Sequence, residues 1–180
     1  VALEDNAYNE SIFGVRLPEQ AQVYWGDMGL AGTWVILRRA DYFDPQQLSG
    51  IPFNRATTMA ARARIARMEP LIMEGQRCQA TLSGTGEQAC RIDERALLLA
   101  CKPGSPAPPD FLAMPFRLPR PALGTWAIRA PDTGIPLLRY FLYDCSQVLA
   151  AGPSAARSTS ALFLEQGLAP GPMRATAALR

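Results

Sequence analysis

The chain has 180 residues, of which 48% are apolar and 19% charged, and its formal net charge is +2. These values are typical of a folded protein, exclude an intrinsically disordered chain and do not favour a nucleic-acid partner. The chain contains no histidine, which excludes a Ser-His-Asp triad, a Cys-His pair and the commonest metal ligand. No apolar run approaches the roughly 20 residues that cross a bilayer, so no transmembrane segment is predicted.

The first part of the chain alternates short apolar stretches with turns, and one helix follows. Residues 11–17 are predicted to be a short strand, and residues 32–38 a second one, rich in β-branched and aromatic residues. Asn54 is a good N-cap for a helix over residues 55–68, which are rich in Ala, Arg and Met. Pro70 is predicted to end this helix, because proline lacks the backbone donor.

Residues 77–102 contain three of the four cysteines and are predicted to form a three-stranded meander. Its first turn is the sequence Ser83-Gly84-Thr85-Gly86. Residues that are opposite one another in adjacent strands lie on one face of the sheet. Cys78, Cys90 and Cys101 are therefore expected at one level of three neighbouring strands.

The even number of cysteines, none of them in a Cys-x-x-Cys pair, favours disulfides over a zinc or thioredoxin-like site. The preferred pairing joins Cys78 to Cys90 and Cys101 to Cys145. The alternative pairing joins Cys90 to Cys101 and Cys78 to Cys145. Because the sequence begins at Val1 without Met, we interpret it as a mature exported protein, periplasmic or extracellular, whose signal peptide was removed. Four reduced cysteines in the cytoplasm are the alternative.

A proline-rich crossover is predicted over residues 102–121, which contain seven prolines. Proline removes a donor from a β-ladder, so only an edge segment is expected there, at residues 111–116. The crossover is the best candidate domain boundary. We prefer a single domain over residues 1–180, because each side alone would be small.

A β-hairpin is predicted after the crossover. Its strands are residues 122–129 and 135–143, its turn is residues 131–134, and it is expected to be central in a sheet. A short helix over residues 154–166 and a loose C-terminal tail over residues 168–180 are predicted beyond it.

The alternation of short strands with turns predicts an α+β or mainly β fold. We expect an antiparallel sheet of about six to eight short strands with one or two helices, because a parallel sheet would need helices between most strands.

The sequence Gly-Thr-Trp occurs twice, ending at Trp34 and at Trp126. The first copy resembles the Gly-x-Trp opening strand of lipocalin- and avidin-like barrels, in which the tryptophan closes one end of the barrel. This resemblance implies a small-molecule carrier with an apolar cavity. A tryptophan on a core strand after a turn glycine is the preferred interpretation. Trp25, Trp34 and Trp126 are accordingly candidate core or ligand-pocket aromatics.

Asp132-Thr133-Gly134 resembles the signature triplet of aspartic proteases, which implies a catalytic carboxylate at Asp132. With one copy in the chain, two catalytic carboxylates would require a homodimer. The sequence Pro-Asp-x-Gly is also a favourable β-turn, which explains these residues without catalysis.

No constellation of residues points to a reaction, and no metal or cofactor site is predicted. The first hypothesis is a non-catalytic structural or protein-interaction module of an exported assembly, with other protein subunits as its partners. A small-molecule carrier is the alternative, and an aspartic-type hydrolase at Asp132 ranks last.

Overall fold

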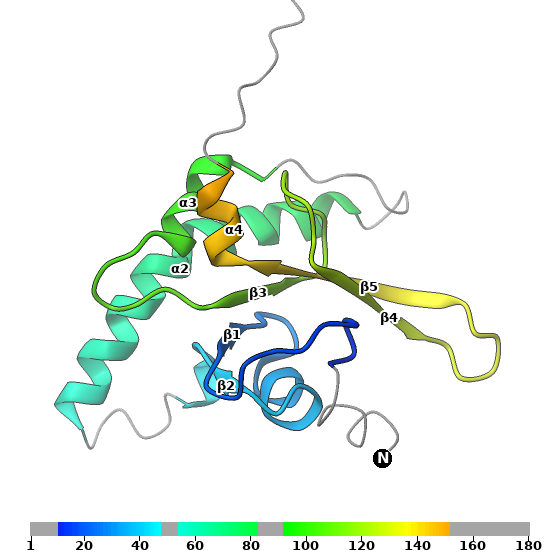
Figure 1. Ribbon diagram of the computed structural model, residues 1–180, viewed down its shortest axis with the longest axis horizontal. Coiled ribbons are helices and arrows are strands. Elements are labelled where there is room, and N and C mark those ends of the chain that lie inside the picture. The colour runs from blue at the N-terminus through cyan, green and yellow to red at the C-terminus, as the bar shows by residue number, and fades with distance from the viewer. Residues whose placement is uncertain (1–10, 48–53, 83–91, 152–180) are drawn as a thin grey trace, which may run out of the picture.

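In the computed structural model, a five-stranded sheet is packed between helices on one side and an irregular N-terminal layer on the other (Figure 1). The structure describes residues 11–47, 54–82 and 92–151. The strands are β1 (Gln22–Tyr24), β2 (Ala40–Asp41), β3 (Phe111–Met114), β4 (Gly124–Arg129) and β5 (Pro136–Asp144). The α+β class is confirmed. The predicted helix over residues 154–166 and the tail over residues 168–180 lie outside the described residues.

The sheet is mixed, with the strand order β2-β1-β3-β5-β4. β1 pairs in parallel with β2 and β3, whereas β5 pairs antiparallel with β3 and β4. The expected antiparallel sheet of six to eight strands is therefore wrong for the described part of the chain. Parallel neighbours require crossovers, and three helical segments that differ from the predicted elements lie in these crossovers.

The first such helix is η1 (Ala31–Ile36), a π-helical segment between β1 and β2. The predicted strand over residues 32–38 is wrong here. Thr33 donates from Oγ1 to the carbonyl of Gly29 and to Oδ1 of Asp41, and these bonds hold a coiled backbone. A Cβ at residue 32 would collide with the ring of Trp25, so the glycine lets η1 pack closely. The bond to Asp41 and the close packing on Trp25 are contacts outside η1 itself, and together they outweigh the local β propensity.

The second is α2 (Arg55–Leu82), a helix of 28 residues. It begins as predicted, because Oδ1 of Asn54 accepts from the backbone N–H of Thr57. It does not end at Pro70, which lies inside it. Met68 and Leu71 on either side are fully buried, and their packing offsets the cost of an internal proline, about 3 kcal/mol.

The third is α3 (Glu94–Cys101), a helix in the last part of residues 77–102, where the sequence predicts a three-stranded meander. Cys78 lies in α2 and Cys101 in α3, so the expected level of three sulfurs in adjacent strands is wrong. Asp93 caps α3 by accepting from the N–H of Arg95. The Ala and Leu residues of α3 favour a helix. A short apolar run by itself does not show whether a segment is a buried helix or a buried strand.

The proline-rich crossover contains β3, which is not the predicted edge segment. β3 pairs with β1 on one side and β5 on the other, and all four of its residues are buried. A central strand is feasible because the prolines flank Phe111–Met114 rather than interrupt it.

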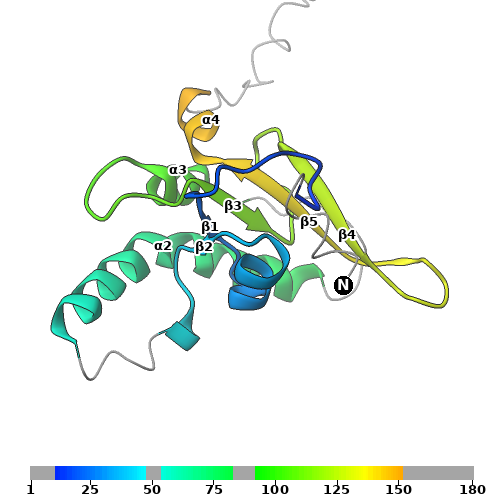
Figure 2. The ribbon, with the colours of Figure 1, turned by 60° about the horizontal axis from the view of Figure 1, so that its bottom comes forward.

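Each face of the sheet carries its own core (Figure 2). α2, α3 and α4 (Cys145–Ala150) pack on the helical face, where Leu112 and Phe141 lie in the core. The N-terminal segment and η1 cover the opposite face, where Trp25 and Tyr140 lie in the core. The predicted strand over residues 11–17 is a series of turns in this second layer.

Candidate interaction surface

The predicted hairpin is confirmed as β4 and β5, and its outer half projects beyond the other described elements (Figures 1 and 2). We call residues 129–138 the arm. The side chains of residues 131–138 are all exposed. The prediction of a central hairpin holds for β5 only, because β4 is the last strand of the sheet.

The turn of the arm follows from its sequence. The N–H of Gly134 donates to the carbonyl of Ala130 at 2.8 Å, and the N–H of Ala130 donates to the carbonyl of Ile135 at 2.9 Å. Gly134 has a φ of 67°, in the left-handed region that glycine adopts without strain. Pro131 fixes φ at the start of the turn. Local chemistry therefore defines the shape of the arm.

Three large apolar side chains are exposed within four residues of the arm. The exposed fractions are 60% for Ile135, 66% for Leu137 and 38% for Leu138. Exposed apolar residues that are scattered singly are normal, whereas a group of them marks an interaction surface. The arm is therefore the strongest candidate for contact with another molecule.

The pleat gives the hairpin two different faces. Trp126 and Tyr140, which are paired across the strands, lie in the core of the N-terminal layer, and Phe141 lies in the core of the helical layer. Successive side chains of a strand point to opposite faces, so Ile128 and Leu138 share the face of Trp126. We call this the aromatic face.

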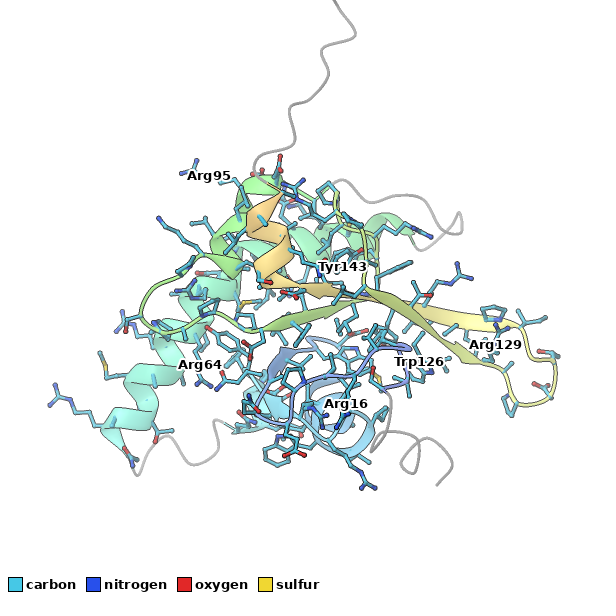
Figure 3. The ribbon with its side chains drawn as sticks, viewed as in Figure 1. Arg16, Arg64, Arg95, Trp126, Arg129 and Tyr143 are labelled. Carbon is cyan, nitrogen blue, oxygen red and sulfur yellow. A yellow bond between two sulfur atoms is a disulfide. The ribbon has the colours of Figure 1, made fainter. Side chains whose placement is uncertain are left out.

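The opposite side is the arginine face. Alternation places Ala127 and Arg139, a cross-strand pair, on the same side as Phe141. The guanidinium of Arg117 lies over the ring of Phe141, 4.8 Å from its centroid. Arg129 lies farther out on the arm and donates to the carbonyl of Gly134 at 3.0 Å (Figure 3). The arginines of this face thus lie beside Ala127 and, by the same alternation, beside the exposed Leu137.

An aromatic cluster anchors the base of the arm. The ring of Trp25 lies 5.9 Å from Trp126, 5.0 Å from Tyr140 and 5.6 Å from Phe13, measured between centroids. The hydroxyl of Tyr140 donates to Oδ2 of Asp27 at 2.8 Å. Burial raises the pKa of Asp27 above its ordinary value, and the bond from Tyr140 partly opposes this rise. The arm therefore projects from a rigid support.

The predicted tryptophans do not form one site. Trp25 is fully buried and Trp126 half-buried, and the two rings are in contact. Trp34 lies on η1, where 54% of it is exposed, and it belongs to neither core. The repeated Gly-Thr-Trp triplet thus occurs in two unlike settings, a π-helical segment and a strand.

The predicted Cys101–Cys145 pair lies at disulfide distance, with 5.0 Å between the Cα atoms, and joins the end of α3 to the start of α4. This bond is incompatible with the alternative pairing. Cys78 is also disulfide-bonded. Its predicted partner, Cys90, lies outside the described residues.

Three carboxylates lie near the phenol of Tyr24. Burial raises the pKa of Tyr24, and the charges of Asp27, Asp41 and Asp44 raise it further. Burial also raises the pKa of Asp41 to about 6. Oδ1 of Asp41 accepts from Thr33, and its buried Oδ2 has no hydrogen-bond partner within the described residues. This group is a source of pH dependence rather than a formed site.

Three surface clefts are formed by residues outside the arm. One of about 230 Å³ is lined by Tyr24, Gly75 and Phe116 among others. Two more, of about 390 and 420 Å³, lie beside the Cys101–Cys145 disulfide and beside Pro106. None of these three clefts is lined by a tryptophan. Asp132 lies at the exposed turn of the arm.

The sequence pattern does not predict the exposure of the arm or the bond between Asp27 and Tyr140. A half-buried strand and a projecting hairpin show the same alternation of apolar and polar residues. The sequence pattern therefore does not distinguish the two. The Pro131-Asp132-Thr133-Gly134 turn gave the position of the arm, but not its exposure.

Comparisons with protein-family models, curated proteins and solved structures found no match to this chain. Among the helices formed by residues 11–47, 54–82 and 92–151, none is both long and apolar enough to cross a membrane.

Proposed function

We propose that this protein is a non-catalytic structural or protein-interaction module of an exported assembly, and that the arm contacts another protein subunit. The observation that carries the proposal is the exposure of Ile135, Leu137 and Leu138 on one projecting hairpin. Such a group of apolar side chains is typical of a binding surface.

The energetics support a role in binding. Fully burying a Leu or Ile side chain contributes about 1.5–3 kcal/mol. The turn and the β4–β5 ladder already hold the arm in one conformation, so little conformational entropy is lost when it is bound. A preformed apolar hairpin is therefore an efficient contact element.

The disulfide supports export. Cys101 and Cys145 are both buried and bonded to each other. Disulfides persist in oxidising compartments and are rare in the cytoplasm. We therefore propose that the assembly works in the periplasm or outside the cell.

The settings of the two Gly-Thr-Trp tryptophans weigh against the small-molecule carrier. A carrier of the type that Gly-Thr-Trp implies needs a cavity at its tryptophan. Trp34, at the end of the first triplet, is instead 54% exposed on η1. Trp126, at the end of the second, contacts the rings of Trp25 and Tyr140. An apolar ligand would have to displace these rings.

The hydrolase has the least support. An aspartic protease holds two carboxylates that share a proton. Asp132 lies in an exposed turn, where such a pair would be open to water.

Site-specific photo-cross-linking tests the proposed function. A photoreactive amino acid replaces Leu137 in the full chain, expressed in the cells that produce the protein naturally. We expect a discrete adduct with one protein. The matched control carries the same group at Met59, an exposed apolar residue of α2 with 54% of its surface accessible.

The adduct at Leu137 should disappear when Ile135→Ser and Leu138→Ser are combined with the cross-linker, while circular dichroism stays unchanged. Equal adducts at Leu137 and Met59, or adducts that persist in the serine variant, would contradict the proposal.

A further inference from the structure

The cleft of about 230 Å³ lies on the helical face of the sheet, between α2 and the residues at the ends of β1 and β3. Its walls include the buried side chains of Leu71, Met114 and Phe116. Pockets for drug-sized ligands occupy about 300–1,000 Å³ and combine apolar walls with a few polar groups. This cleft has the same kind of lining at a smaller size, so it fits a small ligand.

Two glycines keep the cleft open. Gly75 lies on α2, and a Cβ there would come within 3.2 Å of the ring of Phe116. Gly26 follows β1, and a Cβ there would lie 2.5 Å from the hydroxyl oxygen of Tyr24. Both glycines line the cleft, so a side chain at either position would press on one of its walls.

The hydroxyl of Tyr24 is a polar group in this cleft that lacks a partner. Only 6% of Tyr24 is exposed, yet its hydroxyl oxygen forms no hydrogen bond within the described residues. This oxygen is the part of the side chain that lies nearest to Gly26. Buried polar groups are normally hydrogen-bonded, so a ligand in the cleft would satisfy this one.

Asp27 brings a carboxyl group to the same cleft. It accepts a hydrogen bond from the hydroxyl of Tyr140, but it forms no ion pair with an arginine or lysine in the part of the chain that the structure describes. Burial raises the pKa of Asp27, because its charged form has lost part of its hydration. A cation beside the carboxylate would compensate for this loss.

The charges around the Tyr24 hydroxyl determine which ligand the cleft favours. Burial raises the pKa of this phenol, and the charges of Asp27, Asp41 and Asp44 raise it further. Asp41 and Asp44 do not line the cleft and act only through their charge. Carboxylates that disfavour a phenolate repel any anion at the same place and attract a cation.

We propose that this cleft binds a small organic cation that carries a primary ammonium group on a short apolar body. The ammonium donates hydrogen bonds to the carboxylate of Asp27 and to the hydroxyl oxygen of Tyr24. It has three donors and no acceptor, which suits two neighbouring oxygens. The apolar body packs against Leu71, Met114 and Phe116. The cleft shares no residue with the arm, so the inference goes beyond the proposed function.

An NMR titration of the full chain at neutral pH tests the inference. The probe is pentylammonium, and binding is read from the amide signals of Gly26 and Gly75. Pentanol has a similar shape without the charge, pentanoate has the opposite charge, and methylammonium has the charge without the apolar body. We expect pentylammonium to bind at least about tenfold more tightly than each of the three, and less tightly as salt is added.

Two substitutions in the cleft should weaken binding. Tyr24→Phe removes a hydroxyl that has no hydrogen bond to lose, so the urea midpoint should not fall, while the affinity should drop at least about fivefold. Asp27→Asn keeps an acceptor for the hydroxyl of Tyr140 but removes the charge, and the affinity should drop at least about tenfold. Glu19→Gln is the matched control, because Glu19 is an exposed carboxylate outside the cleft.

The absence of binding, equal binding of pentylammonium, pentanol and pentanoate, or an affinity unchanged in Tyr24→Phe and Asp27→Asn would each overturn the inference. A lysine side chain of a bound protein presents the same ammonium group. Tighter binding of lysine blocked at both its backbone ends than of pentylammonium would overturn the assignment to a small molecule. Cross-linking at Leu137 is independent of these results, so failure of the amine titration leaves the proposed function standing.

Discussion

The hydroxyl of Tyr140 donates a hydrogen bond of 2.8 Å to Oδ2 of Asp27, a residue 113 positions away in the sequence. This bond joins β5 to the turn that follows β1, at the base of the arm. It is thus a tertiary link between the sheet and the N-terminal layer.

Removing this hydroxyl should lower stability. We expect Tyr140→Phe to reduce the free energy of unfolding by about 1–2 kcal/mol, because a bond to a carboxylate is lost. The pKa of Asp27 should rise further, since the Tyr140 bond now lowers it. Urea denaturation measures the first effect and NMR titration the second. When Tyr140→Phe is added to Asp27→Asn, it should lower the free energy of unfolding by less than it does in the native chain. An equal loss in the two backgrounds would refute a direct coupling between the two side chains.

Asp41 should make the stability depend on pH. Its pKa is raised from 3.8 to about 6 in the folded chain, so the folded state holds this proton more tightly than the unfolded state. The contribution of Asp41 to the free energy of unfolding is therefore largest below pH 4 and is lost as pH rises toward 6. Asp41→Asn removes the titrating group and should gain stability relative to the native chain between pH 4 and pH 7.

Urea denaturation across this pH range checks the effect. Thr33→Val, which removes the bond to Oδ1, should move the pH-dependent window upward, because that bond lowers the pKa of Asp41. Parallel stability curves for the native chain and Asp41→Asn would show that the carboxyl does not titrate in this window.

The Cys101–Cys145 bond should be a major source of stability. It joins residues 44 positions apart, and the chain-entropy model gives about 4 kcal/mol for a loop of this length. Cys101→Ala combined with Cys145→Ala should lower the urea midpoint accordingly. Thiol titration of the chain without substitutions, unfolded in the absence of a reductant, should find neither cysteine free. Four free thiols would contradict both the disulfide and the export proposal.

Two glycines of the hairpin should differ in their tolerance of a side chain. Gly124→Ala forces a Cβ into the Phe13 carbonyl, and we expect it to cost about 1–3 kcal/mol. Gly134→Ala meets no atom within 4 Å, and only its φ of 67° is unfavourable. Its cost should be about 1–2 kcal/mol, and Gly134→Asn should cost less. Thermal unfolding measures all three, and a fully stable Gly124→Ala protein would refute the close crossing.

The sequence predicted those elements whose signals are local. The Pro131–Gly134 turn and its two strands, the Asn54 cap and the Cys101–Cys145 pair all depend on residue type and spacing, and the structure contains each of them. The position of the arm follows from the turn sequence, but the exposure of its side chains does not.

The remaining elements depend on packing that the local pattern does not predict. α2 continues through Pro70 because Met68 and Leu71 are buried, and η1 coils because Thr33 bonds to Gly29 and Asp41. The partners of Thr33 are near in the sequence, but the β-branched and aromatic residues of η1 favour a strand. The apolar run in α3 is equally compatible with a buried strand. The sequence pattern alone therefore does not show that this segment is a helix.

The disulfide also determines how the molecule bears load. Cys101 and Cys145 close a covalent loop that contains β3, β4, the arm and β5. When an assembly pulls on the chain before Cys101 and after Cys145, the tension passes through the two sulfurs and bypasses the loop. Residues 102–144 then cannot be drawn out in line with the force, so tension applied at these two points does not extend the hairpin that carries Ile135, Leu137 and Leu138.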